Sequence, residues 1–302
     1  MTAPPGIERP NLAREPFTLV DGGLSTALEE LGEKPAGLLW TAAALVDRPE
    51  VITAAHRLFV EAGADVIISA SYQASEAGFT SAGLTPSAAR RLLASTTEVA
   101  RASGAPLVAC SIGPFGACLG DGSEYHGIYA ANWREVRDFH RSRLEVLVPT
   151  ESDLFAIETI PTLTEATIVV EELRELTSAP AWLTFSCRDE THTCGGDVLA
   201  DAALQLAPAL DAIGVNCTAP HLVEPLLRSI DVGLPLVAYP NHGARWDGDH
   251  DCWVGPTGGS EIPDLIPAWL DAGARFIGGC CGIGSKGIEA LAVLRRSLSN
   301  PS

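Results

Sequence analysis

The sequence predicts an α/β fold, a single parallel (β/α)8 (TIM) barrel in which helices surround eight strands. Three observations point to it: eight short apolar runs rich in β-branched residues, helix-like stretches between them, and a length of 302 residues. Apolar runs of this kind are typical of strands that are covered on both faces, and strand–helix alternation is typical of a parallel sheet. A doubly wound open sheet is the alternative, but the count of eight favours the barrel.

Each expected strand is apolar until its last residues, where turn-like or polar residues follow. In chain order these runs are Phe17–Gly23, Asp65–Ser71, Pro106–Ile112, Asp153–Thr159, Ala181–Cys187, Ala212–Cys217, Pro235–Asn241 and Arg275–Cys281.

The clearest expected helices repeat apolar residues every three or four positions. They are Glu50–Ala62, Ser87–Ser103, Thr164–Leu176, Glu261–Ala272 and Ser285–Ser297, the third with Thr164 as its N-cap. The longest connections are Tyr72–Leu84, Gly113–Asn132 and His242–Gly259. Because long connections in a compact domain usually carry function, we expect these three to contribute to a site.

Composition limits the classes of partner. The formal net charge is −18, so we expect no nucleic acid and no anionic membrane surface as a partner, whereas a cationic small molecule is compatible with it. No apolar run is long enough to span a bilayer. Residues 1–15 have no secretory signal pattern and are expected to form a loose extension of one domain, 1–302. We therefore expect a cytoplasmic protein whose eight cysteines are thiols or metal ligands.

Three cysteines fall at the carboxyl ends of expected strands. Cys217 ends the run Ala212–Cys217, and the adjacent pair Cys280 and Cys281 ends the last run. In a (β/α)8 barrel the carboxyl ends of the strands converge on the active site. Three thiolates occupy three corners of a tetrahedral Zn2+ and leave the fourth open, as in a catalytic zinc site. A thiolate-rich site also suits a sulfur-containing substrate.

Other polar residues at the same end suggest a cradle for an α-amino acid. Asp21 and Glu158 end the first and fourth strands and are candidates for binding an ammonium group. Gly22 and Gly23 would allow close approach of a backbone N–H to a carboxylate. Three further candidates for substrate binding are Ser69, Ser71 and Asn216.

A set of short motifs occurs in order along nearly the whole chain. The motifs are Asp21-Gly22-Gly23, Ser71-Tyr72-Gln73-Ala74, Gly113-Pro114-Phe115-Gly116-Ala117, Asp121-Gly122-Ser123-Glu124-Tyr125, Glu158-Thr159-Ile160-Pro161, Gly214-Val215-Asn216-Cys217, Tyr239-Pro240-Asn241 and Gly278-Gly279-Cys280-Cys281. Together they resemble the homocysteine S-methyltransferase family, and within it the branch that uses S-methylmethionine or S-adenosylmethionine. Two departures are Leu24-Ser25 after Asp-Gly-Gly and Gly282-Ile283-Gly284-Ser285 after the cysteine pair.

The resemblance implies a zinc-dependent barrel enzyme of methionine biosynthesis that transfers a methyl group from a sulfonium donor to the thiol of L-homocysteine. It implies Cys217, Cys280 and Cys281 as zinc ligands, with Asp21 and Glu158 contacting the homocysteine amino group. Tyr72, Gln73, Tyr125 and Asn241 are the candidates on the donor side. Aromatic rings in the long loops, Trp253 included, would hold a sulfonium by cation–π contact.

Two other classes of function are compatible with parts of the sequence. A phosphate-binding barrel lyase or isomerase would use the glycines around Cys280 and Cys281, but neither Lys34 nor Lys286 ends a strand to act as its base. A non-catalytic thiol or zinc redox sensor would pair Cys217 with one of the adjacent cysteines. Metal content and turnover distinguish both from the methyltransferase.

Overall fold

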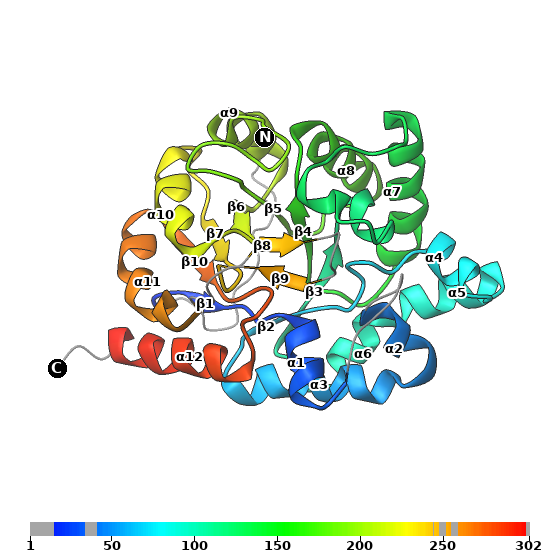
Figure 1. Cartoon of the computed structure of the whole chain (residues 1–302), viewed down its shortest axis with the longest axis horizontal. Coiled ribbons are helices and arrows are strands. Elements are labelled where there is room, and N and C mark those ends of the chain that lie inside the picture. Colours follow the sequence, from blue (N-terminus) through cyan, green and yellow to red (C-terminus); the bar gives the residue numbers. More distant parts are fainter. Residues whose placement is uncertain (1–14, 34–40, 244, 248–251, 255–258, 300–302) are drawn as a thin grey trace.

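The computed structural model describes residues 15–33, 41–243, 245–247, 252–254 and 259–299, and the side chains of these except 41–43, 245–247 and 252–254. Most of the expected N-terminal extension, residues 1–14, lies outside the described part. Figure 1 shows the chain down the barrel, with the strands in the middle and the helices around them.

The eight predicted strands are all present and form one parallel sheet. They are β1 (Thr18–Leu19), β2 (Val66–Ile68), β3 (Leu107–Ile112), β4 (Leu154–Ile160), β5 (Ala181–Phe185), β6 (Ala212–Asn216), β7 (Leu236–Tyr239) and β10 (Ala274–Ile277).

The sheet follows the order β1-β10-β7-β6-β5-β4-β3-β2, and all seven of its neighbouring pairs are parallel. A parallel bridge between Val20 and Val66 joins its two edges, and the Asp21 amide donates to the Val66 carbonyl at 3.0 Å. The (β/α)8 barrel is therefore confirmed, and the open-sheet alternative is wrong. One antiparallel pair was not predicted: β8 (Arg245–Asp247) with β9 (Cys252–Val254), in the connection after β7.

The helices lie outside the strands (Figure 1). Their bounds are α1 (Leu24–Glu30), α2 (Thr41–Asp47), α3 (Pro49–Ala62), α4 (Glu76–Ser81), α5 (Pro86–Ala94), α6 (Thr96–Arg101), α7 (Trp133–Leu147), α8 (Leu163–Leu176), α9 (Leu199–Leu206), α10 (Pro220–Ser229), α11 (Ile262–Asp271) and α12 (Ser285–Ser299). Short 3-10 turns are η2 (Phe115–Cys118), η3 (Ser123–Tyr125), η4 (Ala207–Ala209) and η5 (Gly259–Glu261).

Two helix predictions need correction. The expected helix Ser87–Ser103 is split into α5 and α6 at Ser95, whose hydroxyl donates to the Leu92 carbonyl at 2.8 Å. The N-cap of α8 is Thr162 rather than Thr164: its hydroxyl accepts from the Glu165 amide at 3.2 Å. This hydroxyl satisfies one of the backbone donors that every helix leaves open at its first turn.

Two apolar layers hold the barrel together. The larger lies between strands and helices, and fully buried side chains such as Phe59 and Trp269 belong to it. The smaller fills the barrel interior with mostly small side chains around Trp182 and Tyr239. Because the interior is filled, the polar residues that follow the strands gather at one open end of the barrel.

Candidate active site

The three predicted cysteines meet at the carboxyl ends of the strands. Cys217 follows β6, and Cys280 and Cys281 follow β10, yet their sulfur atoms all lie within 4.8 Å of one another. The Cys217–Cys281 and Cys280–Cys281 sulfur separations are 3.7 Å and 3.9 Å. Cys217 is buried and the other two are half-buried, so the cluster faces the opening of the barrel rather than the core.

These separations fit one tetrahedral ion. Sulfur atoms held about 2.3 Å from a tetrahedral metal lie about 3.8 Å apart, close to both of the measured separations. Hydrogen bonding from the thiols of Cys217 and Cys280 lowers the pKa of Cys281, which favours a thiolate at this position. The donor set therefore suits a soft or borderline metal ion such as Zn2+ and leaves one coordination position open for a further ligand.

The backbone holds the two cysteine segments in register through the end of β7. Cys217 has a φ of 47°, a conformation that residues other than glycine rarely adopt. It is held there because its amide donates to the Tyr239 carbonyl at 3.0 Å and its carbonyl accepts from the Asn241 side chain at 3.1 Å. On the other side, the Cys280 amide donates to the Pro240 carbonyl at 2.8 Å. The sulfur cluster is therefore positioned by the fold itself.

Asp21 and Glu158 are both buried at this end of the barrel, 3% and 7% exposed. Burial raises the pKa of Asp21 well above its ordinary value, and the Glu158 charge raises it further. Burial likewise raises the pKa of Glu158 to about 7, although hydrogen bonds from Ser111 and Tyr239 oppose the shift. Two desolvated carboxylates that repel each other favour the binding of a positively charged group between them.

The serines at the ends of β2 and β3 form a closed chain of hydrogen bonds. The Ser71 hydroxyl donates to the Ser111 carbonyl at 2.8 Å and lies 2.7 Å from the Ser69 hydroxyl. Both predicted serines therefore use their hydroxyl hydrogens inside the protein in this arrangement. Ser111 reaches Glu158 instead, with its hydroxyl donating to Oε1 at 2.5 Å.

Gly22 and Gly23 allow the end of β1 to pack closely against the segment after β10. A Cβ on Gly22 would lie 2.3 Å from the Ile283 carbonyl oxygen, and one on Gly23 would lie 2.7 Å from the Cys280 carbonyl oxygen. The Gly23 amide also donates to Ile283 at 3.0 Å. The close approach that the glycines permit is thus between backbone segments, and the Gly23 N–H is used within the protein.

Asn216 supports the neighbouring strand end. Its side chain accepts from the Thr159 amide at 2.7 Å and donates to the Thr159 hydroxyl at 2.8 Å. Thr159 has a φ of 61°, an uncommon conformation for a β-branched residue, and the two hydrogen bonds hold it there. Asn216 therefore fixes the backbone between Glu158 and Cys217, a structural contribution that sequence reasoning did not assign.

The candidates on the donor side lie around the same opening. Burial raises the pKa of half-buried Tyr125, and the charges of Cys217 and Cys281 raise it further. The Tyr72 ring packs on Gly113, where a Cβ would lie 2.6 Å from it. Gln73 is half-buried, and its carbonyl accepts from a neighbouring thiol at 3.2 Å. The Asn241 side chain contacts the Cys217 carbonyl as described, and the Trp253 side chain lies outside the described part.

Sequence reasoning missed a buried network that holds the connection between β3 and α7. The Glu165 carboxylate is fully buried and accepts from the Phe115 amide at 2.6 Å, His140 Nε2 at 2.9 Å and the Tyr129 hydroxyl at 2.5 Å. Arg143 lies on α7 and donates to the carbonyls of the β2 and β3 ends. The only signal in the sequence was the spacing Thr162-x-x-Glu165, which resembles a helix-capping box.

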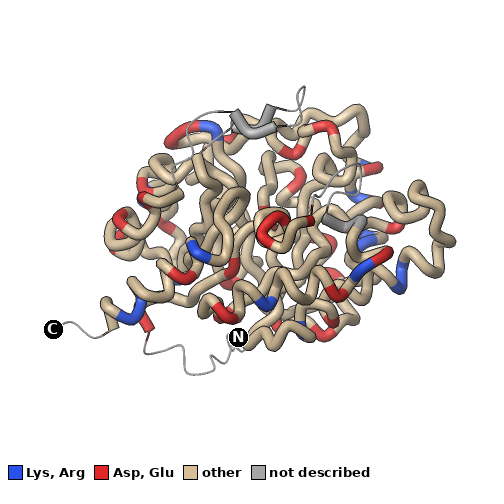
Figure 2. Tube along the Cα trace, turned by 60° about the horizontal axis from the view of Figure 1, so that its bottom comes forward, with Lys and Arg blue, Asp and Glu red and all other residues tan. Residues whose placement is uncertain are grey.

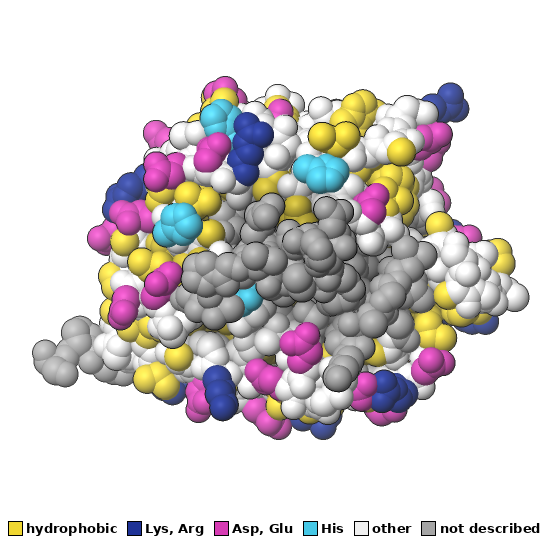
Figure 3. Space-filling view, viewed as in Figure 1, with side chains coloured by type: hydrophobic (Ala, Val, Ile, Leu, Met, Phe, Trp, Pro, Cys, Tyr) yellow, Lys and Arg dark blue, Asp and Glu magenta, His cyan; other side chains and the backbone are white. Residues whose placement is uncertain are grey.

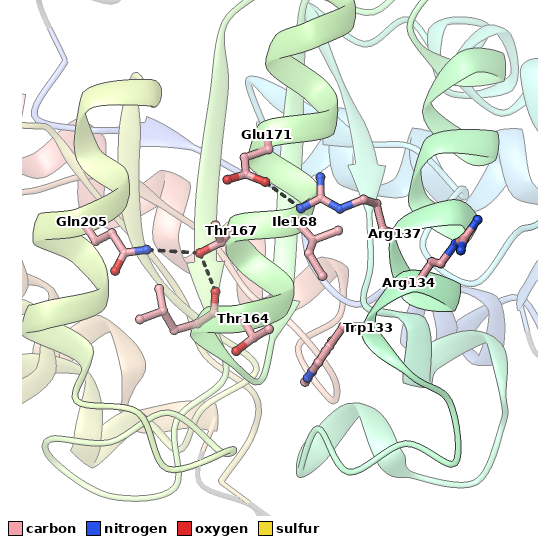
Figure 4. A pocket seen from close by; sticks show the side chains of 9 residues that line it. Trp133, Arg134, Arg137, Thr164, Thr167, Ile168, Glu171 and Gln205 are labelled. Carbon is pink, nitrogen blue, oxygen red and sulfur yellow. Dashed lines mark hydrogen bonds and ion pairs between the residues drawn. The ribbon is translucent and has the colours of Figure 1, made fainter.

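A surface hollow is lined by residues of α7 and α8 and by Gln205 of α9 (Figure 4). Its lining includes an ion pair between Arg137 and Glu171 at 2.7 Å and a hydrogen bond from Gln205 to Thr167 at 3.3 Å. None of its lining residues belongs to the candidate site.

Acidic and basic side chains are both spread around the edge of the molecule on the face shown in Figure 3. In the Cα trace of Figure 2, too, acidic residues are scattered over many elements.

Comparison with known proteins agrees with this geometry. A family model described as homocysteine S-methyltransferase matches residues 18–294. The chain belongs to the homocysteine S-methyltransferase family. It is 37% identical to homocysteine S-methyltransferase YbgG of Bacillus subtilis over 94% of this chain and 96% of that protein. It is 38% identical to the homocysteine S-methyltransferase of Escherichia coli strain K12, over 93% and 96%.

Solved structures of this family superpose on most of the chain. The metallated form of the homocysteine methyltransferase MmuM from Escherichia coli has a TM-score of 0.82 at 38% identity, and covers 94% of this chain and 98% of that one. Its oxidised form also has a TM-score of 0.82, at 37% identity, and covers 94% and 97%. A methyltransferase from Methanosarcina mazei, 12% identical with a TM-score of 0.58, shares the fold alone. As a member of this family, the chain is an enzyme.

No helix within the described ranges is both long and apolar enough to cross a membrane.

Proposed function

We propose that this protein transfers a methyl group from a sulfonium donor to the thiol of L-homocysteine and so forms methionine. One observation carries the proposal: a cluster of three thiols with the spacing of a tetrahedral metal site lies at the same barrel end as two buried carboxylates. The thiols suit activation of a sulfur nucleophile, and the carboxylates suit the ammonium group of an amino acid. The names of the relatives agree with this combination.

Cys217, Cys280 and Cys281 would hold Zn2+. When bound, the ion would remove the proton of a coordinated thiol, which otherwise has a pKa near 8.5 and is mostly protonated at neutral pH. The protein's own contribution is the rigid spacing of the sulfurs, set by the hydrogen bonds of Cys217 and Cys280 to the end of β7.

Asp21 and Glu158 would bind the ammonium group of homocysteine. Burial raises the pKa of both carboxyl groups, which disfavours their charged forms. An ammonium group between them would restore both carboxylates to the ionised form. Ser111 would orient Glu158 through its hydroxyl, and Asn216 would keep the following turn in place. The acceptor would then be held at both ends, by its sulfur and by its amino group.

Transfer from a sulfonium needs alignment more than proton transfer, because its methyl group is already activated. The methyl group leaves the sulfonium sulfur and bonds to the thiolate sulfur, so that an anion and a cation become two neutral thioethers. A site that excludes water favours this loss of charge. The glycines of the β1 and β10 ends support this function by packing backbone against backbone, with no room for a side chain. Both S-methylmethionine and S-adenosylmethionine fit this chemistry as donors.

The proposal is tested by metal analysis of protein purified under reducing conditions, together with methionine formation from homocysteine and each donor. We expect about one Zn2+ per chain, turnover with at least one donor, and loss of turnover on chelation. Protein that turns over fully without metal would contradict the role of the cysteines. Protein that holds zinc but methylates no thiol would contradict the reaction. We also propose one domain over residues 1–302 and a location in the cytoplasm.

A further inference from the structure

Glu124 is a buried carboxylate that the proposed function does not use. It lies in η3, is only 8% exposed, and its Oε2 has no hydrogen-bond partner among the described residues. A carboxylate removed from water without a partner is costly, by several kcal/mol in general. Burial raises the pKa of Glu124 to about 7, and the charges of Asp121 and Cys281 raise it further.

Glu124 shares its surroundings with the sulfur cluster. The charge of Cys281 is one cause of the raised pKa of Glu124. The η3 turn, which carries Glu124, also packs against β4, the strand that carries Glu158. Tyr125 follows Glu124 in η3, in the connection after β3, and Tyr72 follows β2 and packs on Gly113 at the start of that connection. Asp21 and Glu158, by contrast, come from the ends of β1 and β4.

The position of Glu124 is fixed rather than adaptable. A Cβ on Gly116 would lie 2.5 Å from the Glu124 amide nitrogen, so η2 and η3 are packed backbone against backbone. The Glu165 network holds the same connection through Phe115 and Tyr129. The carboxylate is thus presented by a rigid loop, as a preorganised binding group requires.

Within the described ranges, no lysine or arginine is paired with this carboxylate. Among the buried residues that the structure describes, Arg143 is the one lysine or arginine. Its two terminal nitrogens donate to the carbonyls of Ser71, Tyr72 and Gly113, and its Nε has no hydrogen-bond partner among the described residues. A cationic ligand at this end of the barrel would supply the charge that Glu124 lacks among the described residues. The proposed acceptor brings one ammonium group, which Asp21 and Glu158 already suit, so the remaining cation is the donor.

We propose that Glu124, flanked by Tyr72 and Tyr125, binds the positively charged methyl donor and makes the enzyme select sulfonium donors over neutral thioethers. This inference rests on the proposed function. A carboxylate attracts the sulfonium by charge, and the two rings offer cation–π contact to the groups around it. After transfer the former donor is a neutral thioether, so the attraction is lost and release of the product is favoured.

The test compares the wild-type enzyme with Glu124→Gln and with a matched control, Asp121→Asn. The glutamine has the same shape without the charge. The asparagine removes an exposed charge from the same loop and keeps the oxygen that accepts from the Ser123 amide. KM is measured for S-methylmethionine and for homocysteine in turn, with Zn2+ content and melting temperature for each protein.

We expect Glu124→Gln to raise the KM for S-methylmethionine at least 10-fold, and to leave the homocysteine KM and the Zn2+ content within twofold. Asp121→Asn should stay within twofold on all three. An unchanged donor KM in Glu124→Gln, or an equal rise for both substrates, would overturn the inference. Absence of turnover by wild-type enzyme with any sulfonium donor would instead contradict the proposed function.

A second measurement uses the wild-type enzyme and does not depend on a variant that folds. Trimethylsulfonium carries the charge without the amino acid, and dimethyl sulfide is its neutral counterpart. We expect trimethylsulfonium to compete with S-methylmethionine at least 10-fold more strongly than dimethyl sulfide does. Equal competition by the two would show that the site does not recognise the positive charge and would overturn the inference.

Discussion

Replacement of Glu165 by alanine tests whether the buried network stabilises the loop that carries Glu124. The carboxylate accepts three hydrogen bonds, at 2.5 Å, 2.6 Å and 2.9 Å, and is fully buried. A hydrogen bond to a charged group contributes about 1.5–3 kcal/mol, and the loss of a buried network leaves its donors without partners. Since such contributions are not additive, we expect a total loss of about 4 kcal/mol in the free energy of unfolding.

The loss converts into a melting temperature through the size of the chain. At about 2.1 cal/mol/K per residue, the unfolding entropy of a protein this long is about 0.6 kcal/mol/K, so 4 kcal/mol lowers the melting temperature by about 6 °C. Tyr129→Phe removes only the 2.5 Å hydrogen bond and should lower it by about 3 °C. Glu171→Ala is the matched control on α8, because its exposed ion pair should contribute less than about 1 °C.

The assay is thermal unfolding followed by circular dichroism, with the double variant completing the cycle. If the network is real, Tyr129→Phe should have almost no further effect once Glu165 is alanine, because its partner is already absent. Effects of the two substitutions that add in full would refute the reasoning. So would a melting temperature of Glu165→Ala within about 1 °C of wild type.

Three further predictions concern the metal, the pH dependence and the backbone packing. Cys281→Ser should lose bound Zn2+ and turnover, whereas Cys118→Ser should keep both; retention of metal by the first variant would contradict the ligand set. Because the folded pKa of Glu158, about 7, lies above its ordinary 4.5, the folded state holds a proton that the unfolded chain has released between these values. The free energy of unfolding of the metal-free protein should therefore fall between pH 4.5 and 7, and Glu158→Gln should reduce that fall by up to about 3 kcal/mol. Urea unfolding at pH 5 and 8 measures the effect. A variant with the same pH profile as wild type would contradict this role of Glu158. Gly214→Ala should prevent folding or lower the free energy of unfolding by more than about 3 kcal/mol, because its Cβ would lie 1.9 Å from a carbonyl oxygen of β7. Gly83→Ala, which has open space around it and a φ of +96°, should lower it by only about 1 kcal/mol. Equal effects of the two substitutions in denaturant titrations would refute this reasoning.

The strands were predictable because burial on both faces leaves a direct trace in the sequence. A strand such as β4 is buried at every residue, so its whole run is apolar up to the site residues. Helix ends were less predictable because they depend on partners distant in the chain. Thr162 caps α8, but the glutamate three residues later contacts Phe115, Tyr129 and His140 rather than the cap.

The sulfur cluster was predictable because adjacent cysteines at a strand end have few structural explanations. The serine contacts were not, because the hydroxyl that reaches Glu158 is decided by how neighbouring strands are offset. Ser111 rather than Ser69 or Ser71 lies opposite that carboxylate. Glu124 was missed as a separate site residue because nothing in the sequence shows that a charged residue of a glycine-rich loop is buried.

The pairing of β1 with β10 has a consequence for how the protein matures. Thr18 and Leu19 lie beside Phe276 and Ile277, the segment that leads into the cysteine pair. A nascent chain in which only the first seven barrel strands have been synthesised still lacks β10, the strand that seals the barrel. It also lacks two of the three clustered sulfurs. Sealing of the barrel and assembly of the sulfur cluster therefore both require the segment that holds β10 and the cysteine pair. A partly made chain offers metal ions in the cell only one of the three clustered thiols.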